Sequence, residues 1–226
     1  GRSTDFISPS FGYGCLYSCS YCYMKRHKET GLSVATNTGD ILTAINNHAY
    51  FTPVEKPNQT HVKYTTYDIS CNEDFALHAK HHEWEKIFEF FRDHPIAMGS
   101  FATKYVNHRL LRFNPERKIR IRFSLMPQHK SDIHEPHTSK IMDRIRAIDG
   151  FIEAGYDVHV NFSPIIVYHG WLEDYKNLFR DLNNNVEHKD KVLSEVIFLT
   201  HNHKKHVANL QAHPETEMDL WVEDRQ

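Results

Sequence analysis

Two kinds of hydrophobic pattern alternate along the chain. Short runs rich in β-branched and aromatic residues predict strands, and longer segments with apolar residues three or four positions apart predict helices. The predicted strands cover residues 5–8, 61–70, 96–103, 118–125, 158–163 and 196–200. The predicted helices cover residues 41–49, 84–91, 106–111, 139–153, 171–182 and 207–210.

Strands that alternate with helices in this way form a parallel sheet with crossover connections. Six such units predict an α/β fold, a partial TIM-type barrel that is more open than the eight-unit version. Folds of this kind place their chemistry at the carboxyl ends of the strands. The segments that follow the predicted strands are the loop of residues 11–24, then Cys71, Lys104, Ser124, Pro164 and His201. We expect them to converge on one face.

The composition fits one α/β domain that covers residues 1–226. With 226 residues, 40% of them hydrophobic, the chain is long enough to bury a full core, and acidic residues gather in a tail at about 212–226. It contains no apolar run long enough to cross a membrane and no signal peptide, so we expect a cytoplasmic monomer. The net charge of −2 argues against a protein that coats nucleic acid.

Three of the four cysteines lie close together near the start of the chain. Cys15, Cys19 and Cys22 are separated by three and then two residues. Thiolates are soft ligands that suit zinc or the iron of iron–sulfur clusters, and three on one loop can occupy three corners of a tetrahedral site. The open fourth position indicates chemistry, because structural zinc sites and most clusters are closed by four protein ligands.

Three other interpretations of these cysteines stay open at this point. Cys71 can complete a four-thiolate zinc site, the three clustered cysteines can hold an electron-transfer cluster, or the thiols can be unpaired core residues. Disulfides are not expected, because four cysteines in 226 residues are far below the density of a stapled secreted domain.

The cysteine spacing, with Tyr21 just before the last cysteine, resembles the cluster loop of the radical SAM enzymes. The resemblance implies a 4Fe-4S cluster held by Cys15, Cys19 and Cys22, with S-adenosylmethionine bound to the iron that has no protein ligand. It also implies a one-electron reductant of the flavodoxin or ferredoxin type. Reductive cleavage of the sulfonium would then release a 5′-deoxyadenosyl radical.

Further short motifs follow the cysteine loop through most of the chain, from about residue 14 to residue 201. They cover residues 15–23, 71–74, 102–104, 122–124, 135–139, 152–156, 163–166 and 170–171. In their order and spacing they are similar to the spore photoproduct lyase family of radical SAM DNA-repair enzymes. The resemblance implies the radical SAM partial barrel and a lyase that repairs a thymine-dimer lesion.

The family pattern implies cofactor contacts for three further residues. Lys104 and Ser124 match positions that contact S-adenosylmethionine, with Lys104 supplying a cation for its carboxylate. Glu73 falls where the family has a serine, and a carboxylate there suits the cofactor ammonium. The alternative for Lys104 is a surface lysine.

The pattern also implies catalytic roles for a cysteine and two tyrosines. Cys71 matches the residue that returns a hydrogen atom to the product radical, and Tyr21 matches the tyrosine that works with it. Tyr23 is either a second relay tyrosine or a wall of the pocket. A small core residue is the alternative for Cys71, and packing beneath the cluster is the alternative for Tyr21.

The chain departs from the family near its C-terminus. The family carries a basic, aromatic hairpin that inserts into DNA, whereas this sequence ends in the acidic tail. The resemblance implies a thymine-dimer lesion in DNA as the substrate, and this departure leaves another nucleobase, a nucleotide or a small molecule as the alternative substrate within enzymes. A non-enzymatic iron–sulfur or zinc protein that binds nucleic acid is the alternative of another class.

Two further patterns carry expectations about charge. Lys118, Arg120 and Arg122 alternate along one predicted strand, so we expect them on its helix-covered outer face, in salt bridges with helices. The 18 histidines include tracts at residues 78–82, 134–137 and 201–206 that resemble metal sites. Most such histidines are solvated surface groups, and we expect no physiological metal there.

Overall fold

The computed structural model describes residues 3–24, 31–52, 60–196 and 203–212, together with residues 56, 58 and 214. Within this part of the chain, parallel strands form a six-stranded sheet in the order β1-β4-β5-β6-β7-β8. The strands are β1 (Phe6–Ile7), β4 (Thr65–Asp68), β5 (Ala97–Thr103), β6 (Ile119–Ser124), β7 (Asp157–Phe162) and β8 (Leu193–Val196). Because spatial order follows chain order, the sheet curls in one direction into an incomplete barrel, and the predicted fold class is confirmed.

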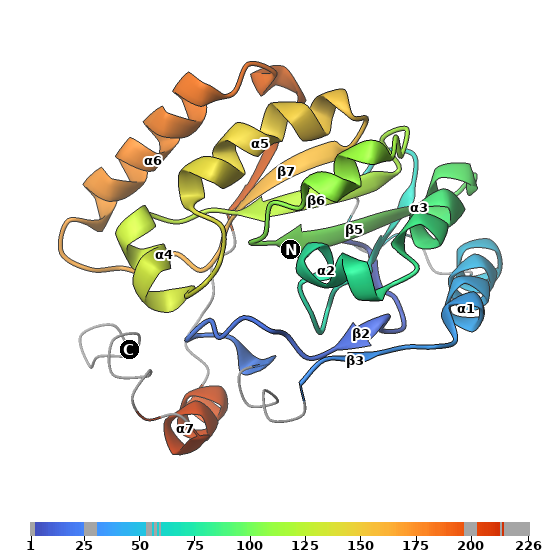
Figure 1. Ribbon diagram of the computed structural model, residues 1–226, viewed down its shortest axis with the longest axis horizontal. Coiled ribbons are helices and arrows are strands. Elements are labelled where there is room, and N and C mark those ends of the chain that lie inside the picture. Colours follow the sequence, from blue (N-terminus) through green and yellow to red (C-terminus); the bar gives the residue numbers. More distant parts are fainter. Residues whose placement is uncertain are drawn as a thin grey trace.

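Helices cover one side of this sheet, as Figure 1 shows for α5 and α6. The α-helices are α1 (Thr38–Phe51), α2 (Phe75–His78), α3 (Trp84–Asp93), α4 (Gln128–His134), α5 (Ile141–Glu153), α6 (Trp171–Asn185) and α7 (His203–Ala212). Three 3₁₀ helices within the described residues are η2 (Ala79–His81), η3 (His108–Arg112) and η4 (Lys189–Lys191). A small antiparallel ribbon of β2 (Gly12–Tyr13) and β3 (Ser33–Val34) lies on the other side of the sheet in Figure 1.

The helical spacing in the sequence identifies the residues that α5 buries. Ile141, Ile145, Ile148 and Ile152 are all buried against the sheet. The helix stops at Gly155, whose φ of +94° favours glycine and whose Cβ would lie 2.0 Å from a side-chain oxygen of Asn114. The predicted helix and its predicted end are therefore both confirmed.

The sequence missed two short helices. Helix α2 has four residues, too few to show a hydrophobic period, and it begins where Asp74 accepts a hydrogen bond from the backbone N–H of Leu77 (3.1 Å). Helix α4 is polar along most of its length, so no apolar stripe marks it. The predicted helix at 106–111 is the 3₁₀ helix η3.

The predicted outer-face position of the basic residues on β6 is wrong. The helices pack against the alternate residues, as the rings of Phe123 and Phe151 show with their centroids 5.4 Å apart. Arg120 and Arg122 therefore point to the inner face, away from the helices. The apolar residues of the strand take the helix-covered side because their burial there stabilises the fold by about 1.5–3 kcal/mol for each large side chain.

The inner face of the sheet carries two ion pairs between strands, one from β6 to the adjacent β7 and one from β6 across β5 to β4. Arg120 Nε donates to Asp157 Oδ2 (2.7 Å), and Arg122 Nη2 donates to Asp68 Oδ2 (2.8 Å). Burial raises the pKa of Asp157, but its hydrogen bond with His159 and the charge of Arg120 outweigh this and lower the pKa to about 2. The expected salt bridges therefore form, but the carboxylates that accept them belong to strands and not to helices.

The third basic residue of the predicted strand, Lys118, lies just before β6 and has a different environment. Its ammonium group donates to the backbone carbonyl of His94 and lies 4.0 Å from the centre of the Tyr64 ring. Burial lowers the pKa of Lys118 to about 8. None of the three side chains contacts a helix through a carboxylate among the described residues.

Three predictions concern parts of the chain that lie partly or wholly outside the described residues. The last described strand is Leu193–Val196, which begins before the predicted strand and includes its first residue, while residues 197–202 with His201 fall outside the described part. The acidic tail falls almost wholly outside it too, and the single domain stays a prediction. Among the helices that are described, none is long and apolar enough to cross a membrane.

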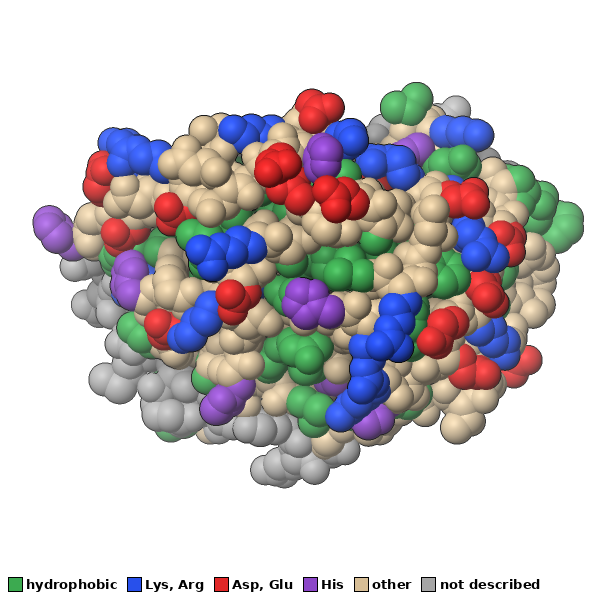
Figure 2. Space-filling model, turned by 45° about the horizontal axis from the view of Figure 1, so that its top comes forward, with side chains coloured by type: hydrophobic (Ala, Val, Ile, Leu, Met, Phe, Trp, Pro, Cys, Tyr) green, Lys and Arg blue, Asp and Glu red, His purple; other side chains and the backbone are tan. Residues whose placement is uncertain are grey.

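The surface carries charges of both signs. On the face in Figure 2, Lys and Arg side chains are interspersed with Asp and Glu side chains. This mixture agrees with the small net charge of the chain.

Candidate active site

The loop of residues 11–24 is tied to the end of β4. The backbone N–H of Gly14 donates to the carbonyl of Asn72 (3.1 Å), and Asn72 Nδ2 donates to Ser10 Oγ (2.6 Å). Gly14 has a φ of +107°, and a Cβ there would lie 2.0 Å from the carbonyl oxygen of Gly31. The sequence Gly-Tyr-Gly before the first cysteine therefore lets the loop turn tightly against its neighbours.

The three clustered cysteines are free thiols on one side of this loop. Cys19 is buried, whereas Cys15 and Cys22 are half-buried, and the backbone N–H of Cys22 donates to the carbonyl of Cys19 (3.1 Å). Burial raises the pKa of Cys19 to about 12, and burial together with the nearby Asp74 carboxylate raises that of Cys15 to about 11. Ligation of a metal would therefore release protons from these thiols.

The cysteines do not form a site for a single metal ion. Among the described residues, no three His, Cys, Asp or Glu side chains are arranged to hold one ion. Cys71 is an exposed residue that follows β4 and lies outside the cysteine loop. This geometry does not support a zinc site completed by Cys71, whereas a 4Fe-4S cluster needs ligands that are farther apart than those of one ion.

Cys71 follows β4 in a turn that an ion pair supports. Asp68 Oδ1 accepts the backbone N–H of Ser70 (2.9 Å), while Asp68 Oδ2 is paired with Arg122. Tyr23 donates its hydroxyl to the Cys71 carbonyl (2.8 Å) and is equally close to a side-chain oxygen of Asn72. Tyr23 thus connects the cysteine loop directly to the residue that carries the fourth thiol.

Tyr21 makes a different contact. Its hydroxyl donates to Glu135, which follows α4, and burial together with this carboxylate raises the pKa of Tyr21 well above its usual value. The Lys104 ammonium group lies 5.8 Å from the centre of the Tyr21 ring. The structure therefore brings Tyr21 to Lys104 and Glu135, and Tyr23 to Cys71.

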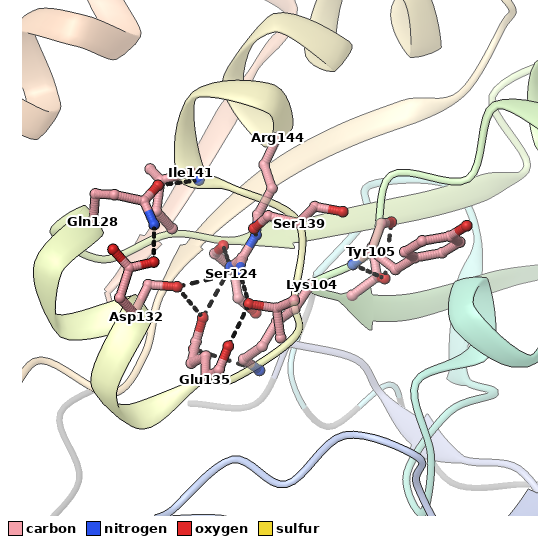
Figure 3. Close-up of polar contacts among 12 residues, drawn as sticks. Lys104, Tyr105, Ser124, Gln128, Asp132, Glu135, Ser139, Ile141 and Arg144 are labelled. Carbon is pink, nitrogen blue, oxygen red and sulfur yellow. Dashed lines mark hydrogen bonds and ion pairs between the residues drawn. The ribbon is translucent and has the colours of Figure 1, made fainter.

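Glu135 and Arg144 form the polar centre shown in Figure 3. Glu135 Oε2 accepts from Arg144 Nη1 (3.0 Å) and from Ser131 Oγ (3.1 Å), and Glu135 Oε1 lies 3.9 Å from Lys104 Nζ. Arg144 Nη1 also donates to the Ser124 carbonyl (2.7 Å). Both members of the pair are almost completely buried. They hold the ends of β5 and β6 together.

Lys104 and Ser124 lie where the sequence predicts them, at the carboxyl ends of adjacent strands. Burial lowers the pKa of Lys104, but Glu135 and the neighbouring Cys19 outweigh this effect and raise it, so the ammonium group stays charged. In the described part of the chain, the hydroxyl of Ser124 has no hydrogen-bond partner. Both groups suit a polar ligand.

Glu73 is more enclosed than the sequence suggests. Its side chain is 1% exposed, and Oε2 is 3.0 Å from His78 Nδ1 and 2.8 Å from His82 Nε2. Glu73 Oε1 is buried and has no hydrogen-bond partner. The expectation of surface histidines is therefore wrong for His78 and His82, which bury their rings against this carboxylate.

Sequence reasoning missed the supporting residues Asp68, Glu135 and Arg144. Glu135 belongs to one of the family motifs, and that was the available signal. The position of Arg144 looks like the polar side of an amphipathic helix, although its side chain is completely buried.

Comparison with known proteins gives this arrangement a family. The family model described as spore photoproduct lyase matches residues 3–226. The chain belongs to the spore photoproduct lyase family. The resemblance in the sequence is thus confirmed over the whole region that carries the site.

Two curated spore photoproduct lyases are similar to this chain. The protein from Bacillus subtilis (strain 168) is 27% identical over 186 residues, which is 80% of this chain and 52% of that protein. The protein from a Geobacillus species is 27% identical over 231 residues, which is 96% of this chain and 64% of that protein. The chain thus spans between half and two thirds of these relatives.

A solved structure supports the fold. A spore photoproduct lyase variant with bound AdoMet and dinucleoside spore photoproduct superposes with a TM-score of 0.78 at 25% identity. The match covers 95% of this chain and 62% of that one. The partial barrel of the radical SAM enzymes is therefore the fold of this chain.

Proposed function

We propose that this chain is a radical SAM enzyme that acts as a spore photoproduct lyase. The observation that carries the proposal is a loop with three free cysteines that lies next to Lys104 and contacts Cys71 through Tyr23, in a member of this family. Relatives of the family have been solved with AdoMet, which is S-adenosylmethionine, and with dinucleoside spore photoproduct. We extend both ligands to this chain.

The residues fit the cofactor pair. Cys15, Cys19 and Cys22 would hold a 4Fe-4S cluster, which would supply, with S-adenosylmethionine, the electron and the 5′-deoxyadenosyl radical. Lys104 would bind the cofactor carboxylate through its half-buried, charged ammonium group. Glu73, which the family pattern places at the cofactor ammonium, is only 1% exposed and lies close to the Gly12 backbone, so we retain its contact with the cofactor as a prediction.

Two further groups of this chain orient the cofactor and the radical. The Ser124 hydroxyl would form a hydrogen bond, as donor or as acceptor, with the polar groups of S-adenosylmethionine. Tyr21, which is half-buried and donates its hydroxyl to Glu135, would form one wall of the site and help to keep water from the radical. We retain its proposed relay with Cys71 as a prediction.

Cys71 would end the reaction. Its S–H bond breaks and a C–H bond forms on the product carbon radical, and the unpaired electron remains on sulfur. Cys71 is an exposed residue beyond the carboxyl end of β4, where a substrate can reach it. Partial desolvation of its thiol and the nearby Asp68 carboxylate raise its pKa, so the hydrogen stays on sulfur. Tyr23 holds the Cys71 backbone beside the cysteine loop.

The substrate and partners follow from the same proposal. The lesion would be the thymine dimer spore photoproduct in DNA, and the electron donor a flavodoxin or ferredoxin. We also propose that the chain works as a monomer in the cytoplasm.

Anaerobic reconstitution followed by turnover tests this function. We expect about four irons per chain, a reduced-cluster EPR signal that changes with S-adenosylmethionine, and conversion of dinucleotide spore photoproduct to thymidine dinucleotide. One zinc per chain, or no 5′-deoxyadenosine with the reduced cluster, would overturn it. Formation of 5′-deoxyadenosine with unchanged dinucleotide would exclude this substrate.

The variant Cys71→Ala tests the last step. It should keep forming 5′-deoxyadenosine but yield altered products, because the product radical has no hydrogen donor. Products identical to those of the unmodified enzyme would remove Cys71 from the mechanism.

A further inference from the structure

Two buried histidines share one oxygen of Glu73. His78 Nδ1 lies 3.0 Å and His82 Nε2 lies 2.8 Å from Glu73 Oε2, and the three side chains are between 0% and 2% exposed. The nearby His81 is exposed. Two of the three histidines in this tract are therefore buried hydrogen-bond partners of a carboxylate and not solvated surface groups.

The second nitrogen of His78 reaches the cysteine loop. The backbone N–H of Leu16, next to Cys15, donates to His78 Nε2 at 3.3 Å. Because Nε2 accepts this bond, it carries no proton, and the proton of the neutral ring lies on Nδ1 and is donated to Glu73. A hydrogen-bonded path therefore runs from the cysteine loop through His78 to a buried carboxylate.

The ring of His78 is fixed relative to Lys104. Asp74 begins α2 by accepting from Leu77, and the same carboxylate accepts the backbone N–H of Lys104 (2.8 Å) and the hydroxyl of Thr103 (2.7 Å). Helix α2 is thus anchored to the end of β5, and it carries His78 one turn later.

The carboxylate is also covered on its far side by the ribbon that leads into the loop. A Cβ on Gly12 would lie 2.6 Å from Glu73 Oε1. The close approach of this backbone leaves the carboxylate little room to move. Glu73 is therefore held between the start of the cysteine loop and helix α2.

We propose that His78 is a positioning residue that sets the orientation of the Cys15–Leu16 peptide, with Glu73 fixing its tautomer. The proposal deepens the proposed function, because Cys15 is one of the three ligands named there. His82 donates to the same carboxylate but makes no contact with the loop among the described residues. Loss of the bond between Leu16 and His78 should therefore disturb the cysteine loop more than loss of the bond between His82 and Glu73.

Two substitutions at His78 separate the loop contact from the Glu73 contact. In His78→Asn the amide nitrogen occupies the position of Nδ1, which keeps the donor to Glu73 and loses the acceptor for Leu16. In His78→Gln the side-chain oxygen reaches the position of Nε2, which keeps the acceptor. His81→Ala is the matched control, because that ring is exposed.

The first measurement needs no iron. In the metal-free protein, hydrogen exchange of the Leu16 amide should be about five- to tenfold faster in His78→Asn, the effect of one lost hydrogen bond. His78→Gln and His81→Ala should leave this rate close to that of the unmodified protein. Equal exchange rates in all four proteins, or equally fast exchange in both His78 variants, would overturn the proposal.

The second measurement follows iron. After anaerobic reconstitution, His78→Asn should bind iron about 10- to 100-fold more weakly and shift the EPR signal recorded with S-adenosylmethionine, whereas His78→Gln should restore both. Full iron affinity in His78→Asn would refute the positioning role. If the unmodified protein binds no iron while the exchange rates behave as expected, the proposed function fails and the role of His78 in the loop stands.

Discussion

Replacement of Glu135 by glutamine tests the polar centre that joins β5, β6 and the cysteine loop. The substitution keeps the shape of the side chain and removes its charge. Arg144 would then be a buried cation without its carboxylate, and the half-buried Lys104 would lose the same neighbour. The N–H groups of the new amide would also point at one of these two cations. The hydroxyl of Tyr21 would lose a charged acceptor.

The structure sets the expected size of the effect. Arg144 is 0% and Glu135 is 1% exposed in their side chains, so water cannot replace the lost partner. Removal of one member of a buried pair costs about 3–5 kcal/mol. For a chain of 226 residues this lowers the Tm by about 6–20 °C. Glu173 on α6 is exposed and pairs with Lys176 and Arg180. The control substitution Glu173→Gln should lower the free energy of unfolding by at most about 1 kcal/mol.

Urea unfolding of the metal-free protein measures both variants. The double variant of Glu135→Gln and Arg144→Met should cost less than the sum of the single changes, by about 0.5–3 kcal/mol. A loss below about 1 kcal/mol for Glu135→Gln, similar to that of Glu173→Gln, would refute the assignment of Glu135 as the centre of the site.

Three further predictions concern other parts of the molecule. Because the pKa of Asp157 is held at about 2, below the unfolded value, its charge stabilises the fold above about pH 4. The unmodified protein should lose about 2 kcal/mol of its free energy of unfolding between about pH 5 and 2, and Asp157→Asn should abolish this dependence on pH. Urea unfolding at each pH measures both proteins. Tyr23→Phe should preserve 5′-deoxyadenosine formation and change the product distribution, and unchanged products would show that the contact with Cys71 is not used. Gly14→Ala should cost about 1–3 kcal/mol and lower the iron content after reconstitution, since its φ is +107°; a normal iron content would contradict this.

Much of the fold followed from local pattern. The strands and the long helices have apolar residues at spacings of two or of three and four, and the packing of α5 on the sheet uses the isoleucines that this spacing marks. The cysteine loop, Lys104 and Ser124 were also located correctly at the carboxyl ends of their strands.

The contacts between distant charges could not be predicted in this way. The face to which Arg120 points depends on which side of β6 the helices cover, and the alternation alone does not reveal that side. Glu135 and Arg144 are nine positions apart in the sequence, and only the folded chain shows that both are buried. The two buried histidines were mistaken for surface groups for the same reason.

The bond between Tyr23 and the Cys71 backbone has a wider consequence. Together with the Gly14–Asn72 contact, it makes one mechanical unit of the segment that would generate a radical and the segment that would extinguish it. A shift of the cysteine loop would move the thiol as well, so the start and the finish of a catalytic cycle would keep their relative alignment. The two segments are 48 residues apart in the chain, yet this contact fixes the distance between them in the folded protein.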